Sequence, residues 1–387
     1  MGNHITLFTS LMQFIGSAGV RFHDIRIMVT FAWAIAGAIL SESVHLGQWA
    51  LFRPDQTSAA SKVRQLSRWI HNDKIRPMQA YRPLVQAILR DFEGQTLYLA
   101  LDTTLLWQRF VIIRVVLPYR GRALPLGWVV YPSGSATVGV GRYQYVLAQV
   151  AELIPASCRV VLLADRGFMD VQLMKLLRQL NWHFRLRVKS SVKIHRATHR
   201  PTTVKALLPP PGHVRCFQYI WLTNQRFGPL YLVVGYVWTT KGLAHWAVVS
   251  DESVSVETLN EYERRFQIEE NFLDDKSAGF QLESSEIEDS MGLSRLCLIL
   301  ASATLFLVSQ GTALVEMGRR HWVDPHWERG LSYVQLGWRW VKRCAVLGGG
   351  LVCHIWLSPE PDPEPAMASK RRFMLSTRRI TSVKQYL

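Results

Sequence analysis

Hydrophobic residues recur at three- and four-residue spacing through the first 92 residues, which is the pattern of helices that bury one face. The pattern is clearest in three runs of the sequence, FAWAIAGAILSESVHLGQWALF, SKVRQLSRWIHND and MQAYRPLVQAILRDF. Residues 1–92 therefore predict a helical domain.

From residue 93 the pattern changes to that of β-strands. Three runs rich in β-branched and aromatic residues, TLYLALD (96–102), RFVIIRVVL (109–117) and RALPLGWVVY (122–131), are joined by links short enough for antiparallel pairing. A helical run, YQYVLAQVAELI, then precedes a further strand, CRVVLLAD, and a further helix, DVQLMKLLRQL. Antiparallel strands followed by alternating helices and strands predict a mixed sheet in an α/β domain.

Residues 182–250 again have the composition of strands, separated by turns such as PPPG, and predict a β-rich insertion in this domain. The apolar run LCLILASATLFLV is about 13 residues long, shorter than the roughly 20 that cross a bilayer, and favours a buried core helix. Residues 311–387 predict a C-terminal helical region with a glycine loop at 348–350, a linker at 358–367 and a basic tail.

The formal net charge of +16, from 45 Lys and Arg against 29 Asp and Glu, favours a polyanionic partner, above all nucleic acid. Basic residues gather around SKVRQLSRWIHND, so the 1–92 domain is a candidate DNA-binding domain with this run as its recognition helix; the charged face of an ordinary helical bundle is the alternative. The gathered residues are Lys62, Arg64, Arg68 and Lys74. The last 22 residues, with six basic and no acidic side chains, are a phosphate-binding arm or a solubilising tail.

Five scattered cysteines with no C-x2-C pair predict reduced, structural thiols in a cytoplasmic protein. The N-terminal MGNHIT satisfies a loose myristoylation pattern, and a membrane-associated protein is the alternative that it supports together with the apolar helix. We expect no membrane partner.

Acidic residues occupy three positions where catalytic groups are expected. Asp102 ends TLYLALD and Asp165 ends CRVVLLAD, and strand ends in α/β sheets commonly present catalytic groups to a crevice. In EYERRFQIEENFLDDKSAG, helical geometry places four residues within an arc of roughly 60°: Tyr262, Arg265, Glu269 and Lys276. A solvated, salt-bridged helix face is the alternative.

The three carboxylates Asp102, Asp165 and Glu269 are the ligand set that Mg²⁺ requires, and two such ions roughly 3.5 to 4 Å apart can support phosphodiester cleavage. On the same helical face, Arg265 and Lys276 would meet DNA phosphates and Tyr262 would hydrogen-bond to the DNA backbone. In the predicted insertion, Arg185, Arg187 and Lys189 alternate along one strand and would project together toward phosphate or toward solvent.

The sequence resembles the DDE transposases of bacterial insertion sequences, specifically insertion-sequence family four, whose signature is Tyr-x2-Arg-x3-Glu-x6-Lys. The charged segment reproduces all four positions, ALDTT resembles the family's first catalytic Asp and ADRGF its second. The resemblance covers about residues 96–310. It implies a ribonuclease H-like catalytic domain over 93–310 with a β-strand insertion at about 182–250.

The resemblance also implies catalytic and metal-binding roles for the three carboxylates, with two Mg²⁺ ions for which Mn²⁺ can substitute. Its expected partners are double-stranded DNA, as transposon ends and target, and a second copy of the chain in a synaptic homodimer. The expected location is the bacterial cytoplasm, at the nucleoid. HWAVVSDESV resembles the setting of a tryptophan that stacks on a flipped base, which points to Trp246, with Trp238 as the second choice and a packed core Trp as the alternative.

These observations predict a transposase that binds terminal inverted repeats, hydrolyses one strand to expose a 3′-OH and transfers that strand to DNA. Two alternatives remain open at this point. One is a metal-dependent endonuclease without strand transfer, and the other is a catalytically inactive, transposase-derived DNA-binding protein.

Overall fold

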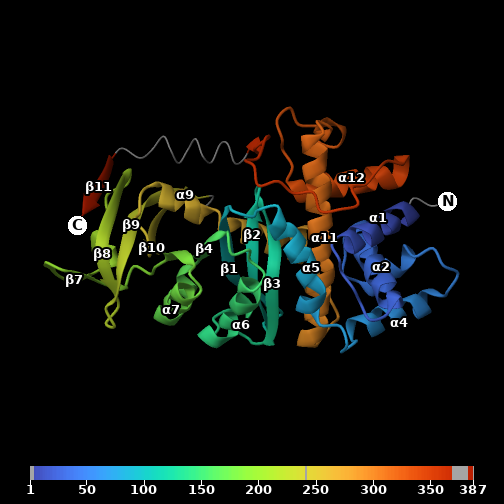
Figure 1. Cartoon of the computed structure of the whole chain (residues 1–387), viewed down its shortest axis with the longest axis horizontal. Coiled ribbons are helices and arrows are strands. Elements are labelled where there is room, and N and C mark those ends of the chain that lie inside the picture. The colour runs from blue at the N-terminus through green and yellow to red at the C-terminus, as the bar shows by residue number, and fades with distance from the viewer. Residues whose placement is uncertain (1–3, 240–241, 368–381, 387) are drawn as a thin grey trace.

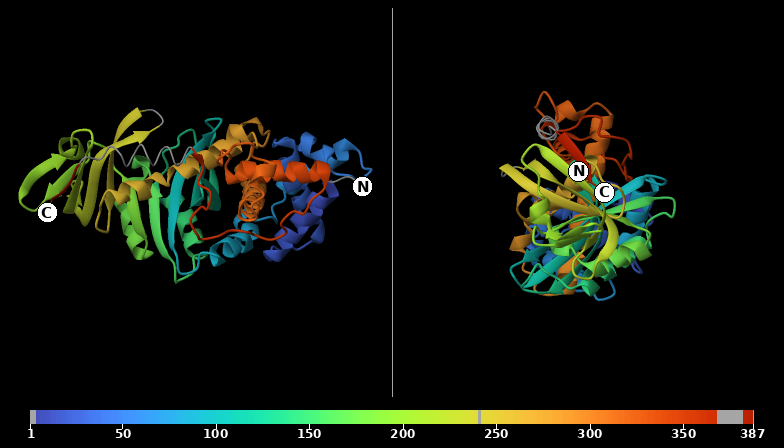
Figure 2. Two further views of the ribbon diagram at one scale, coloured as in Figure 1. Left: turned by 90° about the horizontal axis from the view of Figure 1, so that it is seen from above. Right: turned by 90° about the vertical axis from the view of Figure 1, so that its left-hand side faces the viewer.

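The computed structural model describes residues 4–239, 242–367 and 382–386. The chain is elongated, with the amino-terminal helices at one end, a sheet in the middle and the strands of the insertion at the other end (Figure 1). Seen from above, the same three parts follow one another along the long axis (Figure 2).

The amino-terminal region folds as five helices that pack on the rest of the chain. Asp24 begins the second helix by accepting a hydrogen bond from the Arg26 N–H at 2.8 Å, and Ser58 caps the fourth helix in the same way. One hydrophobic core extends from Leu7 to Leu357, so these helices share a core with the central sheet. The helices are α1 (His4–Ser17), α2 (Ile25–Ser41), α3 (Leu46–Leu51), α4 (Ala59–Ile70) and α5 (Pro77–Arg90).

Five strands form the central sheet in the order β3-β2-β1-β4-β5. The first three strands pair antiparallel, whereas β4 and β5 run parallel to β1. This is the order and orientation of a ribonuclease H-like sheet, which confirms the predicted fold class. The elements are β1 (Thr96–Leu106), β2 (Phe110–Tyr119), β3 (Arg122–Pro132), α6 (Val140–Ala151), β4 (Arg159–Ala164), η1 (Arg166–Phe168), α7 (Val171–Gln179) and β5 (His183–Arg187).

The β-rich insertion continues the central sheet and does not form a sheet of its own. Its last strand pairs antiparallel with β5, from Val248 opposite Arg187 to Ser250 opposite Arg185. The segment from residue 182 was predicted to open the insertion, but its strand β5 belongs to the central sheet. The inserted elements are β6 (Lys193–Arg196), β7 (His199–Thr203), α8 (Val204–Leu207), β8 (His213–Leu222), β9 (Phe227–Thr239) and β10 (Gly242–Ser250).

The charged segment that was predicted as one helix is divided. It forms α9 (Glu257–Glu263), α10 (Phe266–Leu273) and a π-helical turn, η2 (Asp274–Ala278). At the junction the Arg265 N–H donates to the Tyr262 carbonyl and the Ile268 N–H donates to the Arg265 carbonyl, both at 3.0 Å. Each bond joins residues three apart, as in a 3₁₀-helix, which is wound more tightly than an α-helix. A short turn, η3 (Leu282–Ser284), follows.

The long helix α11 (Ser290–Glu316) is the centre of the core. By length and composition alone it could cross a membrane, but 94% of its most apolar window is buried inside the protein, as the core-helix interpretation predicted. It is longer than the apolar run indicated because polar residues on either side of the run, such as Ser294, Ser309 and Thr312, are also buried. After it come η4 (Arg320–Trp322) and α12 (Tyr333–Leu347).

The C-terminal strand β11 (Ser382–Tyr386) pairs parallel with β8, which the sequence did not indicate. The ring of Tyr386 stacks on Phe217 with 4.9 Å between centroids. Most of the basic tail, residues 368–381, lies outside the described residues.

Two glycines let α11 and α12 approach closely. A Cβ at Gly337 would lie 1.9 Å from the Leu307 carbonyl oxygen, and one at Gly311 would lie 2.1 Å from the Tyr333 carbonyl oxygen. We expect Gly337→Ala to lower the free energy of unfolding by about 1–3 kcal/mol, because backbone must move to admit the methyl group. Urea denaturation measures this change.

The control for this prediction is Gly47→Ala in α3, where an added Cβ meets nothing within 4 Å. There alanine should be neutral or stabilise the helix by up to about 1 kcal/mol. Equal stability of the wild type and the Gly337→Ala variant would contradict the close approach.

Candidate active site

Asp102 and Asp165 occupy neighbouring positions at the point where the parallel pairing of β1 and β4 ends. The last paired residues are Leu101 and Ala164, and each aspartate is the next residue in its chain. Asp165 follows its strand directly, as predicted. Asp102 does not end its strand, because pairing with β2 extends β1 to Leu106.

Arg265 joins the first aspartate to Glu269. One of its terminal nitrogens donates to Asp102 Oδ2 at 2.7 Å, and the other donates to Glu269 Oε1. Arg265 is only 3% exposed. The other Asp102 oxygen accepts a hydrogen bond from the Thr103 N–H at 2.8 Å. Asp102 and Glu269 therefore lie on either side of a single guanidinium group.

Asp165 is held from another side. The Tyr262 hydroxyl lies 3.4 Å from Asp165 Oδ1 and donates to it, and Arg187 Nη1 lies 3.9 Å from the same oxygen. Tyr262 is fully buried, so its ring fixes where the hydroxyl can point. Residues of α9, β5 and β4 thus meet at this carboxylate.

The electrostatics of the site favour an added cation. Burial raises the pKa of Asp102, Arg265 opposes the rise, and the charges of Glu269 and Asp165 add to it. Burial acts to lower the pKa of Arg265, but Tyr262 and the surrounding carboxylates raise it overall, so the guanidinium stays charged. Three carboxylates in one place exceed the positive charge that offsets them.

The donor set fits a hard divalent cation, because it consists of carboxylate oxygens that carry excess negative charge. Their ligand oxygens do not all lie within 4.8 Å of one another, since Arg265 occupies the space between Asp102 and Glu269. A cation and this guanidinium would therefore compete for the same two carboxylates.

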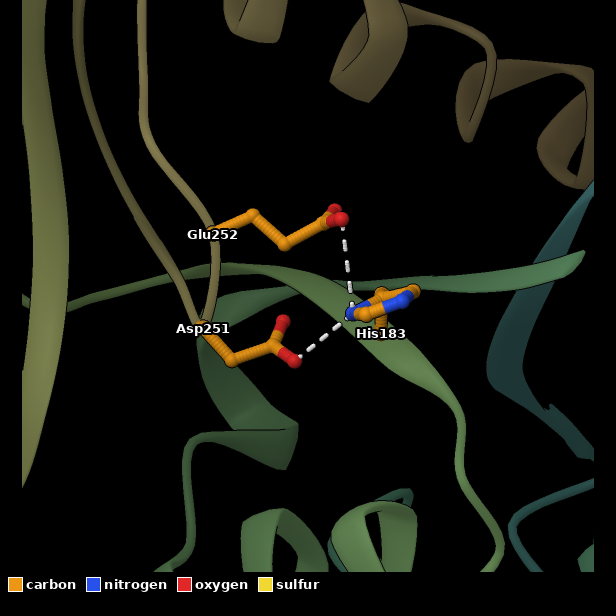
Figure 3. Close-up of side chains that lie close together, drawn as sticks. All are labelled: His183, Asp251 and Glu252. Atoms are coloured by element: carbon orange, nitrogen blue, oxygen red, sulfur yellow. Dashed lines mark hydrogen bonds and ion pairs between the residues drawn. The ribbon is translucent and has the colours of Figure 1, made fainter.

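A second cluster meets the distance criterion for a metal site (Figure 3). In the part of the chain that the structure describes, only His183, Asp251 and Glu252 place three ligand atoms within 4.8 Å. His183 Nδ1 lies 2.9 Å from Asp251 and 3.5 Å from Glu252. Glu252, however, also accepts from the guanidinium groups of Arg159 and Arg185. Because two arginines already offset its charge, we interpret this cluster as an ion-pair network.

Two residues predicted to contact DNA through the signature helix face the carboxylates instead. Tyr262 and Arg265 are buried, and both donate to acidic residues of the site. Lys276 lies on the π-helical turn, where its ammonium group donates to the Leu105 carbonyl and lies 3.2 Å from Glu283. The predicted common face is therefore directed at the end of β1 and the site.

The row predicted for Arg185, Arg187 and Lys189 is not formed. Arg185 is buried and donates to Glu261 at 2.8 Å, since β5 is an interior strand with both neighbours paired. Arg187 lies over the Trp246 ring, 5.7 Å from its centroid. Lys189 is exposed, beyond the end of β5.

Trp246 is a packed core residue, the alternative considered above. It is buried, stacks on Phe266 at 5.5 Å between centroids and meets Tyr262 edge to face. The ring is thus not free to stack on a base in this structure. The side chain of Trp238, the second choice, lies outside the described side chains.

The residues that sequence reasoning missed are the buried Arg114, the partly buried Arg122 and their acidic partners on the charged segment. The sequence feature that could have indicated buried arginine partners is the adjacent pair Asp274 and Asp275, which follows apolar helix positions. Their meaning depends on strand pairing, which a single sequence does not show.

Residues 115–306 match the family model described as the transposase DDE domain. The chain contains a transposase DDE domain. The matched span includes Asp165 and Glu269 and begins 13 residues after Asp102. DDE transposases use divalent metal ions, in agreement with the donor set of the site. The finer assignment to insertion-sequence family four remains a prediction from the signature. A search of curated protein sequences finds no match.

Among solved structures, the chain is similar to the piggyBac transposase in a synaptic complex with hairpin DNA. The TM-score is 0.43 and the identity 12%, over 92% of this chain and 84% of that chain. A weaker similarity is to the Argonaute of Marinitoga piezophila in complex with guide RNA and target DNA. Its TM-score is 0.23 and its identity 10%, over 57% of this chain and 33% of that chain.

The DDE domain has a titratable group behind the site whose effect on stability can be measured. Burial raises the pKa of Asp274 to about 6, with Asp275 and Glu270 adding to the rise and Arg122 opposing it. An unfolded-state aspartate titrates near about 3.9. Because the folded state then binds the proton more tightly, Asp274 contributes stability that grows as the pH falls from about 6 to about 4.

The quantity to compare is the free energy of unfolding of the wild type minus that of Asp274→Asn. We expect this difference to rise by up to about 3 kcal/mol as the pH is lowered from about 7.5 to about 4. Urea denaturation at both pH values measures this difference. Asp73→Asn is the matched control, because the Asp73 side chain is 98% exposed. A difference for Asp274→Asn that does not change with pH would show that its proton affinity is not altered by folding.

Proposed function

We propose that the protein is a DNA transposase that cleaves the ends of a mobile element and joins them to target DNA. The observation that carries the proposal is the convergence of Asp102, Asp165 and Glu269 around Arg265, in a chain with a transposase DDE domain. The strand order explains this convergence, because β1 and β4 present their aspartates at the same level of the sheet.

In this proposal the three carboxylates hold two divalent ions, Mg²⁺ or Mn²⁺, which would activate the attacking oxygen and stabilise the leaving one. Arg265 offsets the carboxylate charge, and Tyr262 orients Asp165 through its hydroxyl. Lys276, tied to the end of β1, places a positive charge beside the site for a flanking phosphate. The exposed 3′-OH would then attack the opposite strand or target DNA.

The insertion supports DNA as the substrate. From α7 through the last strand of the insertion, residues 171–250 hold twelve Lys and Arg and no Asp or Glu. Several of the basic side chains are exposed at the end of the molecule that the insertion forms (Figure 1): Lys189, Lys193, Arg200, Lys205 and Arg226. A surface with positive charge and no acidic residue attracts a phosphate backbone without reading its sequence.

The amino-terminal helices offer a second basic surface. Arg64, Arg68 and Lys74 are exposed around α4, whereas Lys62 is buried and donates to the Arg53 carbonyl at 2.6 Å. We propose that this region binds the terminal inverted repeats, with two chains acting together when two ends are paired. The proposed location is the cytoplasm, where the DNA substrate lies.

Removing any one carboxylate should abolish strand cleavage. We expect Asp102→Asn, Asp165→Asn and Glu269→Gln each to reduce Mn²⁺-dependent nicking of a supercoiled plasmid by about 10³-fold or more, because each removes a charged ligand. Plasmid binding, measured by gel shift, should stay close to that of the wild type.

Glu286→Gln is the control for these variants, since Glu286 is an exposed glutamate in the loop before α11. A carboxylate variant with wild-type nicking would remove that residue from the site. Transfer of a labelled transposon end into plasmid DNA separates the proposed transposase from an endonuclease that ends at hydrolysis. Plasmid binding without nicking by the wild type would instead indicate an inactive DNA-binding protein.

The insertion surface can be tested through the salt dependence of binding. Each single variant Lys193→Gln, Arg200→Gln or Lys205→Gln should lower the slope of log K against log salt concentration by about 0.9, the value for one phosphate contact. Fluorescence anisotropy with a labelled duplex measures the slope. Lys342→Gln on α12 is the control, since α12 lies at a distance from the insertion (Figure 1). Slopes equal to that of the wild type would place the DNA elsewhere.

A further inference from the structure

Arginines from the central sheet hold the segment that carries Glu269. Arg114 on β2 is 1% exposed, and its Nη1 donates to Asn271 Oδ1 at 2.7 Å and to Asp275 Oδ2 at 2.6 Å. Asp275 is 2% exposed. On the next strand, Arg122 lies 3.0 Å from Asp274 and 3.2 Å from Glu270. The end of α10 is therefore fixed to β2 by a buried ion pair and to β3 by ion pairs that are more accessible to water.

Arg114 lies at the level of the site. In the antiparallel register of β1 and β2 it stands opposite Asp102, so the two side chains leave the same face of the sheet. They nevertheless reach different partners. Asp102 bonds to Arg265 before α10, and Arg114 bonds to Asn271 and Asp275 at its far end. Neighbouring positions of two strands thus hold both ends of the helix.

The contacts of Arg114 determine the rotation of α10. Asn271 and Asp275 are four residues apart and lie on one side of the helical segment, while Glu269, two residues before Asn271, lies roughly 200° around the axis. Ile268 and Phe272 pack on the sheet against small and branched side chains, Ala100, Val116 and Ala123. A slip of one residue would turn Glu269 by about 100° and leave two buried charges without partners.

We infer that Arg114 and Asp275 are positioning residues for Glu269, and the inference rests on the proposed function. The pair fixes the helix at the start of the π-helical turn, a region where an extra residue per turn would otherwise leave the rotation free to change. Apolar packing of Ile268 and Phe272 sets the distance of α10 from the sheet, and the ion pair sets which residue faces Asp102.

The double variant Arg114→Met/Asp275→Leu tests the inference in the full-length protein. Replacement of a buried ion pair by apolar side chains of similar size often leaves a protein folded, so rotation can be tested without loss of the fold. We expect the thermal unfolding midpoint and plasmid binding to stay close to those of the wild type. The affinity for Mn²⁺ alone, measured from the free-ion signal in electron paramagnetic resonance, should fall by about 10-fold or more, and plasmid nicking by a similar factor.

The matched control is Arg82→Gln/Glu152→Gln, which removes an exposed ion pair of 3.6 Å elsewhere in the protein. If the double variant does not fold, Asn271→Leu takes its place, because it removes one acceptor of Arg114 and leaves the ion pair intact. A loss of Mn²⁺ affinity of about 3-fold would then support the inference.

Wild-type Mn²⁺ affinity and nicking in the folded double variant, or in Asn271→Leu, would overturn the positioning role alone. Absence of Mn²⁺-dependent nicking in the wild type would overturn the proposed function. The two failures are therefore distinguished by which protein shows them.

Discussion

The structure depends on the need to offset negative charge that is held out of water. Asp102 and Glu269 are kept together by the guanidinium group of Arg265, which is itself buried. Without that cation, the charge of the exposed Glu269 would act unopposed on the largely buried Asp102 and favour its protonated form. Arg265 therefore permits a site that is both compact and acidic. The same arrangement explains why a divalent cation is chemically suited to this position, since it would supply the charge that Arg265 supplies in part.

This requirement extends to the elements around the site. Arg185 on β5 donates to Glu261 of α9 at 2.8 Å, and the Tyr98 hydroxyl of β1 donates to the same carboxylate at 2.7 Å. The residue after Glu261 is Tyr262, which contacts Asp165. Because β5 also pairs with β10, the last strand of the insertion, the site is connected to the DNA-binding surface that we propose. A displacement of the insertion would therefore change the position of Asp165 through two hydrogen bonds, from Arg185 to Glu261 and from Tyr262 to Asp165.

The sequence was sufficient for the central strands and for the prediction that Asp102, Asp165 and Glu269 lie near one another. Runs of β-branched and aromatic residues located β1, β2 and β3 within a few residues, and the spacing from Tyr262 to Lys276 indicated a segment that faces the two aspartates. It could not show that α9 and α10 are separated or that a π-helical turn follows, because residues at both places contact other elements: Arg265 at the junction pairs with Asp102, and Asp275 in the turn pairs with Arg114. The packing of Trp246 was also out of reach, since it depends on β10 lying beside α9.

The error over Arg185 has a general cause. A strand in the interior of a sheet has no open edge, and both of its faces are covered where helices pack on them, so alternation along it does not imply exposure. Net charge likewise counts arginines that neutralise internal carboxylates together with those that meet solvent. Arg114, Arg185 and Arg265 all belong to the first group, as their burial and acidic partners show. The charge available to a DNA backbone is therefore the exposed part of the total, and on the insertion no acidic residue opposes that part.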